Sequence, residues 1–182
     1  MANPIEAFIN IFKEVTDHEE TSPLHVIEVG DCWTYLATLE EFIRFEEMGM
    51  NTTTDDDLVE MLKDALKICQ KQAERLSGFL LKEGVELPNV TPPKPSSSPN
   101  EIPPGVKLSD DDISNGIAFK AVNLMIMAGK GQADSVRTDV GIMWFEFFTE
   151  FSLFGASLKR LMKKRGWLKV PPYYYSSGSS GK

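Results

Sequence analysis

The sequence predicts an all-α protein, a bundle of four long helices with one long crossover. Apolar residues recur at spacings of three and four along four extended stretches, which is the period of an amphipathic α-helix. The second and third stretches are separated by a proline-rich segment, 85–108, which is much longer than a turn between neighbouring helices requires. No stretch shows the alternation that would compete for a β-strand.

The composition is that of an ordinary globular chain. Hydrophobic residues make up 42% and charged residues 25% of the 182 residues, which suits one domain with a sizeable core. A net charge of −8 argues against a nucleic-acid surface. No apolar run approaches the roughly 20 residues of a membrane span. The N-terminus has no basic leader, so Cys32 and Cys69 are expected to be free thiols in an intracellular protein.

A short amphipathic helix is expected within residues 1–20. Asn3, Pro4 and Glu6 supply a cap, a first-turn proline and a third-position acid. The apolar face that follows consists of Ile5, Phe8, Phe12 and Val15. Pro23 then separates this helix from the next one, because the residue before a proline avoids helical backbone angles.

Four long helices follow, with expected ranges 24–50, 55–83, 110–130 and 134–165. Gly84 and Gly166 come directly after the second and fourth of them, where a C-terminal cap is expected. Gly129 and Gly131 predict a turn between the third and the fourth. The fourth helix closes with the basic run "KKR", which suits the negative end of a helix dipole.

The segment 85–108 determines the topology. It contains seven prolines and can be neither helix nor central strand. Its 24 residues reach on the order of 70 Å in polyproline geometry, whereas a helix of about 29 residues is only about 43 Å long. A crossover along the whole bundle explains that length and gives the ferritin-like order, up-down-down-up. The alternative is a long loop in a bundle whose other connections are short turns.

We therefore divide the chain into three parts. Residues 1–20 form the N-terminal helix, 24–168 form a single ferritin-like bundle that includes the crossover, and 169–182 form a tail. Serine and glycine at the end of the tail predict flexibility.

Three consecutive aspartates occur twice, at 55–57 and at 110–112. A calcium loop needs alternating oxygen ligands, a glycine at its sixth position and a glutamate at its twelfth, and neither triplet has them. Thr54 and Ser109 are instead predicted to be helix N-caps. The aspartates then occupy first turns, where each acid stabilises the helix by about 0.3–1 kcal/mol.

The sequence lacks the ligands of a ferritin-like di-metal centre. Such a centre takes a glutamate from each of two helices and a Glu-x-x-His motif from each of the others. The histidines here are His18 and His25, and no Glu-x-x-His motif occurs. No catalytic residue, metal or cofactor is therefore expected.

Three residues stand out as weak metal candidates, namely Glu40, Glu150 and His25. Glu40 is taken as the only carboxylate in the middle of a helix that falls within a core stripe, and Glu150 lies near the edge of the aromatic face of the fourth helix. His25 lies beside Glu28. Glu28 and Glu146 are expected to point further outward.

Other sites leave alternatives open. Gly-rich phosphate loops, Cys-x-x-Cys pairs and a nucleophile elbow are absent from the sequence. Cys32 and Cys69 lie on inward stripes and are expected to be buried small hydrophobes, with a redox pair as the alternative. The basic run "KRLMKKRGWLK" is expected to be a solvated helix end, with a phosphate site as the alternative.

The fourth helix carries more aromatic residues than one stripe can hold; they are Trp144, Phe145, Phe147, Phe148, Phe151 and Phe154. Together with Phe42 and Phe45, they predict apolar surface outside the bundle core. The N-terminal helix, the linker or a second subunit must cover it, and a homo-oligomer (dimer or larger) is expected. The N-terminal helix alone is the rival explanation.

Three segments, "GDCWTYLATLEEFIRFEEM", "LVEMLKDALKICQKQAERLSGFLLKEGVELP" and "FGASLKRLMKKRGWLKVPPYY", resemble the spore coat protein F-like family of ferritin-like proteins. The resemblance covers about 24–175, and some relatives are known only as a domain of unknown function. It implies a four-helix bundle without an established enzymatic activity and supplies no catalytic residues.

The expected function is that of a non-catalytic structural or interaction protein linked to sporulation or the spore coat. Its expected partners are copies of itself and spore coat proteins, without nucleic acid or a membrane span, in the cytoplasm or the spore. The alternative is a degenerate ferritin-like oxidase or metal-storage protein. A third possibility is a small apolar ligand between the helices.

Overall fold

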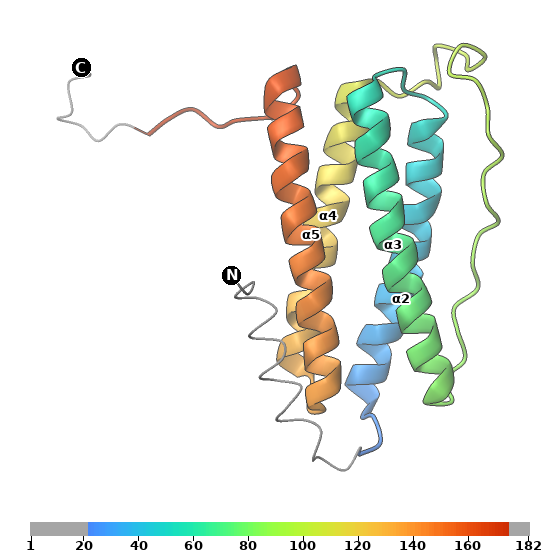
Figure 1. Ribbon diagram of the computed structural model, residues 1–182, viewed down its shortest axis with the longest axis vertical. Coiled ribbons are helices and arrows are strands. Elements are labelled where there is room, and N and C mark those ends of the chain that lie inside the picture. Colours follow the sequence, from blue (N-terminus) through green and yellow to red (C-terminus); the bar gives the residue numbers. More distant parts are fainter. Residues whose placement is uncertain (1–21, 175–182) are drawn as a thin grey trace, which may run out of the picture.

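The computed structural model describes residues 22–174, which contain four long helices and no strand (Figure 1). The helices are α2 (Val26–Met50), α3 (Asp56–Lys82), α4 (Asp110–Asp134) and α5 (Thr138–Arg165). The helix expected within 1–20 and the end of the tail lie outside the described residues. Across residues 22–174, no helix has the length and apolar character that crossing a membrane requires.

The helices form an up-down-down-up bundle, as the sequence predicted. α2 and α3 form one antiparallel hairpin and α4 and α5 the other (Figure 1). Between the hairpins, α2 packs on α4 and α3 packs on α5. The crossover returns along the outside of the bundle, from the end of α3 to the start of α4 at the opposite end (Figure 1). This is the ferritin-like arrangement.

The crossover is held against α2. The indole N–H of Trp33 donates to the carbonyl of Glu86 at 3.0 Å, and the side-chain amide of Asn51 donates to the carbonyl of Pro95 at 2.9 Å. From Trp33 to Asn51, α2 advances about 27 Å. Nine residues of polyproline helix, from Glu86 to Pro95, advance about 28 Å. The proline-rich segment therefore runs beside α2 with the rise per residue of a polyproline helix, the conformation that its composition favours.

The turn between α4 and α5 comes later than the sequence predicted. α4 runs through Gly129 and Gly131 to Asp134, and α5 begins at Thr138. The turn expected at these glycines is wrong because Gly131 has a packing role. A Cβ atom there would lie 2.4 Å from the Trp144 indole, which is too close for any side chain.

Both aspartate triplets lie at helix starts, but one cap differs from the prediction. Ser109 caps α4 in a reciprocal pair with Asp112. The N-cap of α3 is Asp55, whose carboxylate accepts from the backbone N–H of Leu58 at 3.0 Å, so the assignment of Thr54 is wrong.

The acids at the start of α3 also pair with the basic end of α5. Arg165 lies 3.0 Å from Asp55 and 2.9 Å from Asp57, and Lys164 lies 3.0 Å from Asp57. Surface ion pairs contribute only about 0–1 kcal/mol each. The network engages Lys164 and Arg165 of the basic run, while Lys159, Arg160 and Lys163 are exposed, as expected of a solvated helix end.

Most aromatic residues of α5 are buried, whereas Phe148 is exposed and Phe145 is half-buried. Tyr35 of α2 stacks on Phe147 at a centroid distance of 5.6 Å and meets Trp144 edge-on at 5.0 Å. Phe151 and Phe154 are also in the core. The bundle accommodates these rings because they come from one helix but pack against several others. Exposed apolar side chains lie on α4, at Phe119, Val122 and Ile126, and also on α2, α5 and the crossover.

Glu28 closes the end of the bundle at which α2 begins. Its side chain is buried, at 2% exposure, and Oε1 accepts from the backbone N–H groups of Val136 and Arg137, both at 2.9 Å. Oε2 accepts from the N–H of His25 at 3.2 Å, and His25 in turn caps α2 with its imidazole. The expected outward orientation of Glu28 is wrong because the turn before α5 supplies donors that α2 alone does not reveal.

Arg137 completes this end cluster, which we define as His25, Glu28, Glu83, Arg137 and Asp139. The buried guanidinium pairs with Glu83 at 2.9 Å and with Asp139 at 2.7 Å. It also donates to the carbonyl of Ser22 at 3.2 Å. The cluster therefore joins the start of α2, the end of α3 and the turn between α4 and α5.

Glu28→Gln should destabilise the protein near neutral pH. Burial alone would raise the pKa of Glu28, but the N–H groups of Arg137, His25 and Val136 lower it below its ordinary value of 4.5. An amide has one acceptor oxygen instead of two and lacks the charge, so we expect a loss of about 1–3 kcal/mol in the free energy of unfolding.

Denaturant unfolding at several pH values measures this loss. A lowered pKa in the folded state gives stability that is fully present above about pH 4.5 and lost as the pH falls through the folded pKa. Wild type and variant should therefore converge in acid. Glu60→Gln, on the exposed side of α3, is the matched control and should change little. A difference that persists unchanged at low pH would contradict the role given to the Glu28 carboxylate.

Candidate functional site

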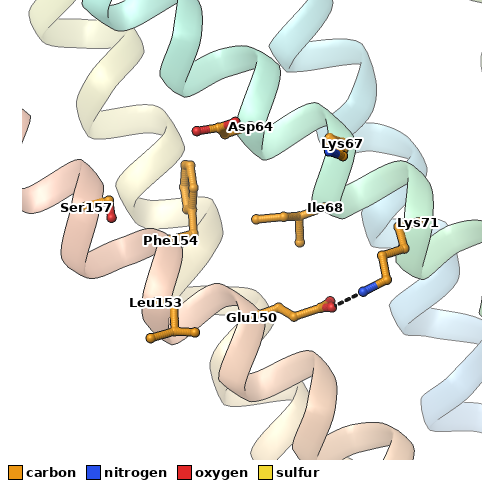
Figure 2. Close-up of a pocket in the computed structure, with 8 residues that line it drawn as sticks. All are labelled: Asp64, Lys67, Ile68, Lys71, Glu150, Leu153, Phe154 and Ser157. Carbon is orange, nitrogen blue, oxygen red and sulfur yellow. Dashed lines mark hydrogen bonds and ion pairs between the residues drawn. The ribbon is translucent and has the colours of Figure 1, made fainter. Parts of the chain in front are cut away.

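A groove lined by both apolar and charged side chains lies between α3 and α5 (Figure 2). It has a volume of about 420 Å³. α3 contributes Asp64, Lys67, Ile68 and Lys71, and α5 contributes Glu150, Leu153, Phe154 and Ser157. The ion pair between Lys71 and Glu150 closes one end (Figure 2). Glu150, one of the weak metal candidates, thus lines this groove.

A hydrogen-bonded chain leads from this groove into the core. The Tyr35 hydroxyl donates to Oε1 of Gln72 at 2.8 Å, and Nε2 of Gln72 donates to Oε2 of Glu150 at 2.8 Å. Burial raises the pKa of Tyr35, with smaller contributions from Cys69 and Glu150, so the phenol keeps its proton and acts as a donor. We call Tyr35, Gln72, Glu150 and Lys71 the polar chain.

Gln72 is a site residue that sequence reasoning missed. It falls on the inward stripe of α3 between Cys69 and Leu76, three residues after the first and four before the second. An amide at a core position needs partners, and this spacing was the available signal. Its partners come from α2 and α5, which the sequence alone does not bring together.

The polar chain does not fit a metal centre. One oxygen of Glu150 pairs with Lys71 and the other accepts from Gln72. The Lys71 ammonium group would repel a cation at this position. The donors and acceptors of the chain therefore satisfy one another, and the arrangement is that of a structural network that is buried at Tyr35 and Gln72 and reaches the surface at Lys71.

The other two candidates lie elsewhere. His25 caps the start of α2, about 22 Å along the helix from Glu40. Glu40 is half-buried; burial raises its pKa, while Arg44 acts in the opposite direction. The structure does not bring His25, Glu40 and Glu150 together. Within residues 22–174, no group of three or more His, Cys, Asp or Glu side chains is placed to hold a metal ion.

Glu46 is the second residue that sequence reasoning missed. It is buried on α2 at 2% exposure, and its Oε2 has no hydrogen-bond partner within the described residues. Glu40 is therefore not the only mid-helix carboxylate in a core stripe, as the sequence suggested. Glu46 lies three residues after the buried Ile43, the same spacing that marks the apolar stripe.

Lys120 of α4 provides the positive charge near Glu46. Its Nζ lies 3.9 Å from the ring centroid of Phe42 and 4.3 Å from that of Phe45. These contacts hold the ammonium group over two aromatic faces. Burial raises the pKa of Glu46 to about 8, and Lys120 acts in the opposite direction. Burial lowers the pKa of Lys120.

The two cysteines are free thiols in the core. Burial raises the pKa of Cys32 to about 12 and also raises that of Cys69. A thiol in this state is rarely ionised and reacts poorly. This environment favours the interpretation of buried small hydrophobes over that of a redox pair.

Glu46→Gln should stabilise the protein at pH 8. The pKa of Glu46 is about 8 in the folded state, against an ordinary value of 4.5. The folded state therefore binds the proton more tightly, and wild-type stability falls as the pH rises from 4.5 to 8. The variant lacks this ionisation, so we expect it to gain about 1–3 kcal/mol over wild type at pH 8 and much less at pH 5.

Denaturant unfolding at the two pH values measures the gain. Glu74→Gln, an exposed position on α3, is the control and should show no such pH-dependent difference. If the free energy of unfolding of Glu46→Gln differs from that of wild type by the same amount at both pH values, Glu46 does not titrate in this range.

The comparisons with known proteins agree with the architecture. Residues 14–179 match a family described as a protein of unknown function (DUF3231). The uncharacterized protein YvdQ of Bacillus subtilis (strain 168) is 29% identical over 160 residues, which is 88% of this chain and 94% of YvdQ.

Two solved structures share the fold. The "putative spore coat protein" of Bacillus halodurans C-125 superposes with a TM-score of 0.83 and 31% identity, over 85% of this chain and 98% of that one. A protein of Anabaena variabilis ATCC 29413 with DJ-1/ThiJ/PfpI-like and ferritin-like domains gives a TM-score of 0.61 at 14% identity, over 84% of this chain and 41% of that one. This second likeness concerns the fold alone. The family match spans the whole described bundle, and the chain belongs to the DUF3231 family of proteins of unknown function.

Proposed function

We propose that this protein is a non-catalytic ferritin-like bundle that acts as a structural or interaction protein of sporulation or the spore coat. The observation that carries the proposal is the polar chain. At the groove between α3 and α5, Glu150 is engaged by Lys71 and Gln72, and Gln72 is engaged by Tyr35. These contacts use the polar groups for packing and leave no set of open ligand positions.

The link to the spore rests on similarity. The "putative spore coat protein" of Bacillus halodurans covers nearly the same length and has the same bundle. A match along all four helices suits a protein whose shape and surface are its function. We accordingly assign this chain a place among spore coat proteins, with coat components as its partners.

Self-association belongs to the same proposal. Leu153 of α5 is 62% exposed on the rim of the groove between α3 and α5, and Phe148 of the same helix is also exposed. Exposed apolar side chains of this kind mark interaction surfaces when they are grouped. We expect a dimer or larger assembly through such helix surfaces.

A second candidate, a degenerate metal-binding oxidase or storage protein, is favoured by one observation. Glu46 is buried with an unpartnered carboxylate oxygen, and Glu40 lies six residues earlier on the same helix. An unsatisfied buried carboxylate is costly and calls for a proton or a cation.

Metal analysis of protein purified without chelator separates the two candidates. The proposal predicts iron and manganese far below one equivalent per chain, and no change in metal content for Glu46→Gln or Glu150→Gln. Stoichiometric iron or manganese that is lost in either variant would overturn the non-catalytic proposal in favour of the second candidate.

Light scattering coupled to size exclusion tests the assembly. We expect a mass of at least two chains, and Leu153→Asp should reduce it because a charge on the apolar rim opposes association. Leu81→Asp, at an exposed position of α3, is the matched control. A strict monomer at all concentrations would contradict the self-association part of the proposal.

A further inference from the structure

The outer face of α4 carries an apolar stripe. Phe119, Val122 and Ile126 are 76%, 48% and 66% exposed, and their spacing of three and four places them on one side of the helix. Single exposed apolar residues are ordinary, but three in one stripe form a patch that a partner would cover.

A groove between α4 and α5 adjoins this stripe. Its volume is about 260 Å³, and it is lined mainly by small and flexible apolar residues, among them Ala118, Val122, Met125, Gly155, Ala156 and Met162. A Cβ atom built at Gly155 meets no atom within 4 Å. The small side chains leave space for an approaching helix, and the methionines can adapt their shape to it.

We propose that residues 3–17 of this same chain dock on this surface as an amphipathic helix. Ile5, Phe8, Phe12 and Val15 would share the docking face at helical spacing, with Ile9 beside them. Glu6, Lys13, Glu14 and Asp17 would lie on the opposite face. The segment therefore has an apolar face that would cover the exposed stripe on α4.

The attachment point and the length of the segment favour this occupant. The carbonyl of Ser22 accepts from the Arg137 guanidinium, which ties the chain to the bundle end where α5 starts. From Asp134 at that end, Ile126 lies about 12 Å and Phe119 about 23 Å along α4. Four linking residues reach about 13 Å, and a helix over 3–17 adds about 22 Å. The apolar face of the segment can thus span the stripe.

The charged residues of the segment suit a helix docked in this way. Its polar face carries three acids and one lysine, which would stay in solvent when the apolar face packs on the groove. A second copy of the bundle would need its own matching surface, whereas the tethered segment is already present at high local concentration.

Cysteine labelling in the full-length chain tests the docking. Cys32 and Cys69 are buried and should stay unreactive, so a new cysteine in Val122→Cys reports on the groove. Maleimide should label it about tenfold or more slowly than in the same protein carrying Phe8→Asp and Phe12→Asp, because docking covers the thiol. A cysteine in Lys63→Cys, exposed on α3, should label equally fast in both backgrounds, and Cys32 and Cys69 that stay unreactive in both show that the bundle remains folded.

Protein concentration distinguishes the occupants. Protection by the chain's own segment is independent of protein concentration. Equal labelling rates in the two backgrounds, or protection that appears only as the concentration rises, would overturn the proposal, and the second result would assign the groove to another copy of the chain.

Discussion

The arrangement of the bundle depends on one buried carboxylate. The Glu28 carboxylate accepts hydrogen bonds from the backbone N–H groups of Val136 and Arg137, which precede α5 and have no partner within that helix. Because Glu28 belongs to the first hairpin and the turn to the second, this contact sets how the hairpins meet. Arg137, buried beside it, adds the end of α3. At the opposite end, Arg165 performs a similar role with the aspartates before and within α3.

The interior between these ends is held by polar groups as well as by packing. The polar chain connects α2, α3 and α5 through Gln72, while Lys120 of α4 lies near the buried Glu46 of α2. Such networks rigidify a core when all partners are present and destabilise it when one is missing. Glu46 with its free oxygen is the exception and gives the core a dependence on pH.

Sequence reasoning reached the four helices and the crossover because each has a local signal. Apolar periodicity marks the helices, and seven prolines exclude a helix or a central strand for the segment beside α2. Gly131, Glu28 and Glu46 were misjudged because tertiary neighbours decide their roles. Gly131 resembles a helix stop until Trp144 is packed on it. A helical wheel places Glu28 and Glu46 by the polarity of their own side chains alone. It does not show the turn before α5 that donates to Glu28, or the lysine of α4 that lies near Glu46.

Amide hydrogen exchange at Val136 and Arg137 tests the account most directly. Both N–H groups are in a short turn, where amides usually exchange by small local openings. If the Glu28 carboxylate joins the two hairpins, these amides should exchange only as slowly as the core of α2 and α5, through global unfolding. Exchange at the rate of an exposed loop, with the helices still protected, would contradict the claim that this contact holds the bundle together.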